Sequence, residues 1–191
     1  LETPAATPRH YRFKQPFGLP VRYHDIKVFS EVSNLDLVAI HLSYKDLEVD
    51  LNQVLPDRQG IGLVVHAPEL FAGDHTLDLC TEDSSYRDHS IAELQRVIDI
   101  SRDLRTRFRC PDPVLLVTNV GGFSEHHHLN RSEREPLRER LIRSLQQLNT
   151  AGEVEIIPQT MPPFPWHFGG QRFHNLFVDQ DFIRQFCEEQ G

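Results

Sequence analysis

Short apolar runs alternate with longer amphipathic stretches along most of the chain. Four of these runs are rich in aliphatic side chains, and we expect each to form a buried strand: 35–40, 60–65, 114–117 and 154–157. Apolar residues at helical spacing predict helices that begin near Ser90, Ser132 and Asp179. Ser90 with Glu93 three residues later has the pattern of a capping box. A further short helix is expected within 21–32.

Strands that alternate with helices predict βαβ units with right-handed crossovers. Two α/β architectures fit this order, a doubly wound open sheet and a (β/α)8 barrel of the TIM type. No GxGxxG motif follows a strand, which disfavours the dinucleotide-binding form of the open sheet. A closed barrel has about eight strands. The four predicted strands are about half of that number, so the barrel interpretation implies a partial barrel with about four to five βα units.

The first 20 residues differ from the rest of the chain. They contain four prolines and little apolar periodicity, so we interpret 1–20 as a linker or arm and 21–191 as the barrel domain. The chain begins at Leu1 and not at Met. We expect it to be a piece of a longer protein that ends after the helix following the fifth strand.

Charge and cysteine content narrow the functional classes. Lys and Arg total 20 against 28 Asp and Glu, for a net charge of −8. This balance argues against nucleic acid or an anionic membrane as a partner. No apolar run approaches the ~20 residues of a membrane helix. The three cysteines lack CxxC spacing, which is typical of reduced thiols in a cytoplasmic protein.

Polar side chains follow each predicted strand: His41, His66 with Glu69, Asn119, and Gln159. The carboxyl ends of parallel strands meet at one edge of a sheet, so we expect a shared polar pocket there. A neutral imidazole at His66 suits a metal ligand or a general base. The Gln159 amide donates and accepts hydrogen bonds but is a poor metal ligand.

A proline-rich segment at 162–171 presents aromatic side chains before a Gly-Gly turn. Trp166 and His167 suit the apolar face of a sugar ring, and Arg172 suits a phosphate or carboxylate. The histidine run at 126–128 resembles a metal tract. Consecutive side chains of a helix or strand cannot all face one ion, so we interpret this run as a solvated loop.

Three motifs in this order, VVHAPEL, LLVTNVGGFSE and EIIPQTMPPFPWHFGGQ, resemble the xylose-isomerase-like barrel superfamily over about 35–190. The chain is similar to isomerase/epimerase-like domains fused behind sialic acid synthase-type enzymes. The resemblance implies an enzyme of sugar isomerase or epimerase type in nonulosonic (sialic-type) acid or related sugar metabolism. It implies a sugar or sugar phosphate substrate, a divalent metal (Zn, Mn, Mg or Co) and an adjacent synthase domain as partner.

The resemblance also implies roles for individual residues. It implies catalytic roles for His66, Glu69 and Gln159. It implies metal binding by His66 and Gln159. Substrate binding falls to His41, Asn119, Trp166, His167 and Arg172. Asn119 stands where the superfamily usually has His-Pro-Gly, and Gln159 where it has a metal-binding Glu.

An amide at position 159 holds a sugar hydroxyl but cannot act as a base. Two interpretations stay open: the base lies outside this chain, or the domain binds sugar without transforming it. The second makes it a non-catalytic binding or tethering module of a multidomain synthase. The superfamily's repair endonucleases are disfavoured, because the acidic chain opposes DNA binding.

Overall fold

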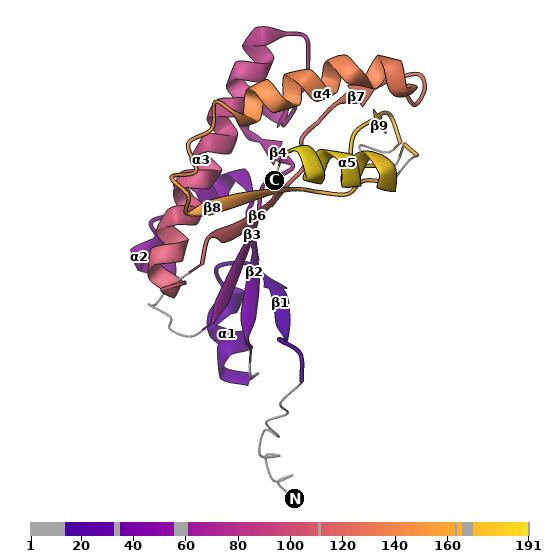
Figure 1. The fold of residues 1–191 in the computed structure, drawn as a ribbon. Coiled ribbons are helices and arrows are strands. Elements are labelled where there is room, and N and C mark those ends of the chain that lie inside the picture. The colour runs from indigo at the N-terminus through magenta and orange to yellow at the C-terminus, as the bar shows by residue number, and fades with distance from the viewer. Residues whose placement is uncertain are drawn as a thin grey trace, which may run out of the picture.

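A five-stranded parallel sheet forms the centre of the protein (Figure 1). The computed structural model describes residues 14–32, 35–55, 61–110, 112–162, 164–165 and 170–190. The strands, in spatial order, are β1 (Gly18–Val21), β2 (Leu37–His41), β3 (Gly62–His66), β6 (Val114–Thr118) and β8 (Val154–Pro158). Four of them confirm the predicted strands to within a few residues.

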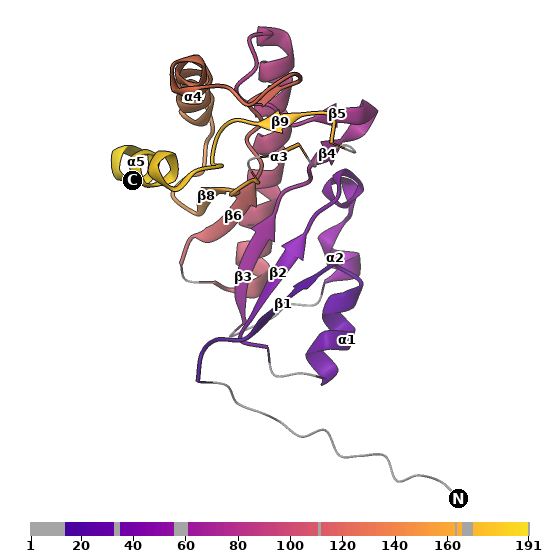
Figure 2. The ribbon, with the colours of Figure 1, turned by 90° about the vertical axis from the view of Figure 1, so that its right-hand side faces the viewer.

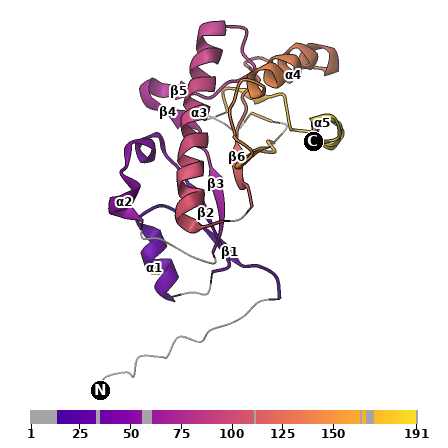
Figure 3. The same ribbon diagram turned by 60° about the vertical axis from the view of Figure 1, so that its left-hand side comes forward.

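Helices are interleaved with these strands, which makes the fold α/β. They are α1 (Asp25–Val32), α2 (Leu51–Val54), α3 (Ser84–Phe108), α4 (Arg131–Leu145) and α5 (Gln180–Gln190). In Figure 2 the strands stand in front of α3, and in Figure 3 α1, α2 and α3 lie along one side of β1–β3. This single-sided cover is what successive right-handed crossovers produce.

The strands follow each other across the sheet in chain order. A doubly wound sheet reverses this order at its switch point, and no such reversal occurs among the described strands. Within the described residues β1 and β8 are the two edges of the sheet and do not pair, so the sheet does not close into a barrel. What the structure shows is therefore an open parallel sheet wound in one direction.

The two faces of the sheet are covered differently. Ile40, Val65 and Leu116 are completely buried and join one apolar cluster with α3. On the opposite face Leu115 is 39% exposed, although it is the neighbour of Leu116 in β6. Successive strand residues point to opposite faces, so only one face packs under the helices.

The helix predicted from Ser90 begins earlier than expected. Asp83 is the N-cap of α3, and its carboxylate accepts a hydrogen bond from the Tyr86 amide at 3.1 Å. Ser90 lies inside the helix and is fully buried, with its Oγ 2.9 Å from Nε2 of His75. The predicted capping box is wrong, because the Ser90 hydroxyl bonds a distant loop and not its own backbone. The other two helices begin within two residues of the predicted positions.

The amino-terminal boundary also differs from the predicted one. Gly18–Pro20 belong to β1, which pairs with β2, so the end of the predicted 1–20 arm is part of the sheet. Residues 1–13 lie outside the described residues. The segment 21–32 contains the expected short helix, α1.

Short strands and turns cover the carboxyl end of the sheet. They are the hairpin β4 (Leu70–Phe71) and β5 (His75–Thr76), the pair β7 (Phe123–Ser124) and β9 (Phe173–His174), and the 3-10 helices η1 (Tyr44–Glu48) and η2 (Ala72–Asp74). Figure 1 shows β4, β7 and β9 at the end of the molecule to which β3 and β6 lead. No helix in the described part of the chain is long and apolar enough to cross a membrane.

Candidate functional site

Two histidines stand side by side at the carboxyl edge of the sheet. His41 ends β2 and His66 ends β3, and the parallel register pairs them directly. Their rings are stacked, with centroids 4.5 Å apart and planes 12° apart. The sequence predicted both residues at this edge, and the structure confirms that the register brings them together.

The hydrogen bond of His66 defines its neutral tautomer. Its Nδ1 lies 3.0 Å from the carbonyl oxygen of Ala67, which only accepts hydrogen bonds. Nδ1 therefore carries the proton in the neutral ring, and the lone pair is on Nε2. A half-buried imidazole with this tautomer can accept a proton, or a hydrogen bond from a ligand, at Nε2.

The environment of His41 favours its neutral form. Burial lowers the pKa of His41, and the neighbouring His66 and Arg22 lower it further, while the nearby Glu69 carboxylate raises it. The pKa moves down from a usual value near 6.5, so His41 is uncharged at neutral pH. Glu69 is half-buried, and its charge acts on His41.

Asn119 and Gln159 follow β6 and β8 one register step beyond the paired Thr118 and Pro158. Asn119 is 5% exposed, and its Oδ1 accepts a hydrogen bond from the Gly121 amide at 3.0 Å. The Gln159 amide N–H donates to the Thr118 carbonyl at 2.8 Å, which fixes the backbone of Gln159 at the edge. Both predicted amides therefore lie at the same edge as the histidines.

The side chain of Gln159 carries a buried and unsatisfied oxygen. No described residue donates a hydrogen bond to its Oε1. Leaving a buried acceptor without a partner costs about 1–3 kcal/mol. Such an atom at the carboxyl edge is suited to a ligand hydroxyl or N–H group.

Asp78 is a candidate residue that the sequence interpretation missed. Its Oδ1 accepts hydrogen bonds from the amides of Gly122 at 3.0 Å and Cys80 at 2.9 Å. Burial raises the pKa of the Asp78 carboxyl, and these amides and Arg172 oppose the rise. The available signal was an aspartate between two leucines, Leu77 and Leu79, because a charge within an apolar run is commonly held by specific partners.

Gly121 makes the close approach to Asp78 possible. Gly121 has a φ of 82°, and a Cβ built on it would lie 2.5 Å from the Cα of Asp78. The Asn119–Gly122 turn and the Asp78 loop are thus held against each other. The two glycines that follow Asn119 serve this packing.

The remaining predicted residues are only partly described. The Arg172 guanidinium lies over the Phe123 ring, 5.5 Å from its centroid, and acts on the Asp78 carboxyl. Trp166 and His167 lie outside the described residues. In the histidine run, His126 and His127 are exposed, whereas Nδ1 of His128 lies 3.1 Å from the His174 carbonyl.

The proposed metal ligands do not make a metal site by themselves. His66 and Gln159 provide one imidazole and one neutral amide, whereas a catalytic divalent ion usually takes about three imidazole or carboxylate ligands. Across the described part of the chain, no three His, Cys, Asp or Glu side chains are grouped so that they could hold an ion. These residues do not fit a resident divalent ion, and the chemistry derived below uses protein groups alone.

Known proteins were compared with the chain in three ways. No family model, no curated protein and no solved structure matches it.

Proposed function

We propose that this domain is a sugar isomerase or epimerase-like domain built as part of a (β/α)8 barrel. The observation that carries the proposal is the pairing of His41 and His66 at the carboxyl edge, with Asn119 and Gln159 at the ends of the next two strands. Barrel enzymes place their active sites at this edge. The motif resemblance supports a sugar or sugar phosphate as the ligand.

The groups at this edge match the needs of proton transfer next to a carbonyl. Nε2 of His66 takes the proton from the carbon beside the carbonyl, and the C–H electron pair forms the double bond of an enediolate. The amide N–H groups of Asn119 and Gln159 donate to the oxygen that gains charge. Return of the proton to the same carbon on the opposite face of the enediolate completes an epimerisation. Its return to the neighbouring carbon, with the hydroxyl proton passing to the former carbonyl oxygen, completes an isomerisation.

Glu69 and His41 support this role of His66. The Glu69 carboxylate acts on the charge of His41, the partner of His66 in the stacked pair. His41 covers one face of the His66 ring and limits its rotation. In this proposal Glu69 and His41 position and stabilise, and His66 transfers the proton.

A second candidate function is a sugar-binding or tethering module of a multidomain synthase. The amides of Asn119 and Gln159 favour it, because a metal-dependent enzyme would have an imidazole and a carboxylate at these two positions. Metal content separates a metal-dependent enzyme from the two metal-free alternatives. A stoichiometric divalent ion that survives dialysis supports a metal enzyme, and its absence supports the binding module or the metal-independent transfer described above.

Solvent deuterium exchange tests the proposed function. The protein is incubated in D2O with hexose and pentose phosphates, and NMR follows deuterium at the carbon next to the carbonyl. We expect exchange that His66→Asn slows by about 100-fold or more, because general-base catalysis contributes about that much. His24→Asn is the matched control, since the His24 side chain is 81% exposed and its Nε2 lies 3.4 Å from Oδ1 of Asp25 in α1.

Three outcomes would contradict the enzymatic proposal. Equal exchange rates in His66→Asn and the wild type would remove His66 from the reaction. Binding of a sugar phosphate without exchange would assign the domain to the binding module. Neither binding nor exchange across the panel would reject the sugar function altogether.

A further inference from the structure

Arg22 extends the histidine pair to a third strand. Val21 ends β1 opposite Ile40, so Arg22 follows at the register position of His41, which in turn pairs with His66. Parallel neighbours in register lie about 4.8 Å apart along the hydrogen-bonding direction. Arg22, His41 and His66 thus form a row across the ends of β1, β2 and β3.

The backbone of Arg22 is held in place by the start of α1. Its amide donates to Oδ2 of Asp25 at 3.0 Å, and the Asp25 amide donates back to the Arg22 carbonyl at 3.0 Å. The side chain is anchored as well, because Nη1 donates to the His41 carbonyl at 2.6 Å. An arginine fixed at both ends loses less conformational entropy when it binds a ligand.

The rest of the guanidinium is available to a ligand. Nη1 lies 3.5 Å from Asp46, whose Oδ2 already accepts from the Ser43 amide and hydroxyl at 2.7 Å each. No described residue accepts a hydrogen bond from Nε or Nη2 of Arg22, and the side chain is 45% exposed. These two groups form the planar fork that binds two oxygens of a carboxylate or phosphate.

We infer that Arg22 binds an anionic group of the ligand, a phosphate or a carboxylate, beside the His41–His66 pair. The inference rests on the proposed function and adds to it the charge of the substrate and the residue that recognises it. The neutral sugar part then lies toward Asn119 and Gln159. The sequence predicts Arg172 for this role as well, and its guanidinium lies over the Phe123 ring.

Arginines elsewhere are less suited to the role. A cleft of about 420 Å³ between α4 and α5 is lined by several arginines. Two of them are held by carboxylates: Arg134 contacts Asp179 at 2.6 Å, and Arg138 contacts Glu135 at 3.0 Å. An anion entering there competes with these ion pairs. Arg22 offers its Nε–Nη2 edge without displacing an ion pair.

Titration with inorganic phosphate tests the Arg22 site without a sugar. NMR spectra of the histidine rings are recorded in the wild type, in Arg22→Gln and in Arg22→Lys. We expect saturable shifts of the His41 and His66 signals in the wild type, with affinity roughly tenfold weaker in Arg22→Gln. Arg22→Lys keeps the charge without the fork, so its affinity falls between the two. Arg143→Gln is the control, because the Arg143 side chain is 63% exposed and pairs with Glu139 on its own helix.

Sugar ligands then distinguish phosphate from carboxylate. We compare three ligands at equal concentration: glucose phosphate, glucuronate and glucose. We expect Arg22→Gln to weaken the binding of the two charged ligands and to leave the binding of glucose unchanged. Phosphate binding that is equal in the wild type and Arg22→Gln, or absent from both, overturns the inference. Sugar binding that persists in that case leaves the proposed function intact, so the two failures are distinguishable.

Discussion

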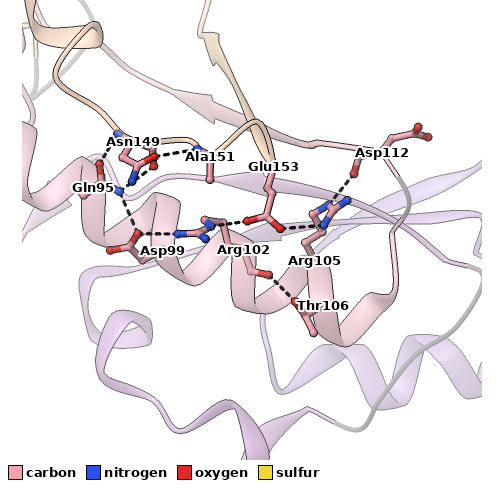
Figure 4. Close-up of polar contacts among 9 residues, drawn as sticks. All are labelled: Gln95, Asp99, Arg102, Arg105, Thr106, Asp112, Asn149, Ala151 and Glu153. Atoms are coloured by element: carbon pink, nitrogen blue, oxygen red, sulfur yellow. Dashed lines mark hydrogen bonds and ion pairs between the residues drawn. The ribbon is translucent and has the colours of Figure 1, made fainter.

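The amino edge and the carboxyl edge of the sheet, at the two ends of its strands, use polar side chains in opposite ways. At the amino edge, Glu153 precedes β8 and lies between two arginines of α3 (Figure 4). Its oxygens accept from Nε of Arg102 at 2.7 Å and from Nη1 of Arg105 at 3.2 Å. Gln95 donates to the carbonyl of Asn149 and accepts from its amide. Each polar group named here has a partner.

The carboxyl edge holds polar groups that are perturbed by burial. Gln159 has a buried oxygen without a donor among the described residues, and burial shifts the pKa of His41 down and that of Asp78 up. A shifted pKa occurs in structural ion pairs as well as in ligand sites, so the unsatisfied Gln159 oxygen is what sets the carboxyl edge apart. The amino edge holds α3 to the sheet through satisfied pairs, whereas the carboxyl edge keeps a buried acceptor without a donor among the described residues.

Replacing one glycine at each edge by alanine gives the largest expected difference between the edges, measured as the loss of unfolding free energy. Gly121 at the carboxyl edge and Gly152 at the amino edge both have positive φ, so each substitution costs about 1–2 kcal/mol of unfolding free energy. At Gly121 the new Cβ also overlaps Asp78, whereas at Gly152 it meets open space. We expect Gly121→Ala to cost about 3 kcal/mol or more in total. Urea unfolding measures both, and equal losses would show that the Asp78 contact is not tight.

Replacing Gln159 by leucine tests whether the unsatisfied oxygen is kept for a ligand. Gln159→Leu removes a buried acceptor that has no donor among the described residues, so we expect stability to rise by about 1 kcal/mol. Sugar binding should fall at the same time. A loss of stability in urea unfolding would mean that the oxygen is satisfied in solution, and the contrast between the edges would then weaken.

Glu153→Gln has the smallest expected effect, and it depends on pH. The hydrogen bond from Arg102 and the charges of Arg102 and Arg105 lower the pKa of Glu153, against a smaller opposing effect of burial. A carboxyl whose pKa is lowered by folding stabilises the protein above its unfolded pKa. That contribution is lost as the pH falls through the lower folded pKa.

The measurement compares wild type and Glu153→Gln in urea at neutral pH and below pH 4. We expect the variant to be slightly less stable at neutral pH and the gap to close in acid. High salt should also narrow the gap, because these side chains are partly exposed. A gap that is constant with pH would assign the effect to packing, and the amino edge would not depend on its ion pairs.

Local patterns in the sequence predicted most of the central sheet. The runs near Ile40, Val65, Leu116 and Ile156 became strands because their β-branched and aliphatic side chains favour extended backbone and one face of each strand packs under the helices. Strand β1 was missed, since Gly18–Val21 is four residues long and contains Pro20. An edge strand needs no such apolar signal and tolerates proline on its unpaired side.

The sequence predicted those site residues that lie at the ends of predicted strands. His41, His66, Asn119 and Gln159 follow predicted strands, and the structure places all four at the carboxyl edge. Asp78 and Arg22 were not found, because each depends on a contact made across the chain: Asp78 with Gly122, and Arg22 with the His41 carbonyl. Contacts between residues far apart in sequence leave no local periodic signal.

The sequence by itself determined the α/β class, the positions of four strands and the polar residues at their ends. These follow from side-chain periodicity and chain order, which are local properties. Only the tertiary structure decided the direct pairing of His41 with His66, the addition of Arg22 to their row and the burial of Asp78. Strand register and loop packing set these contacts, and both depend on the whole sheet and its helices together.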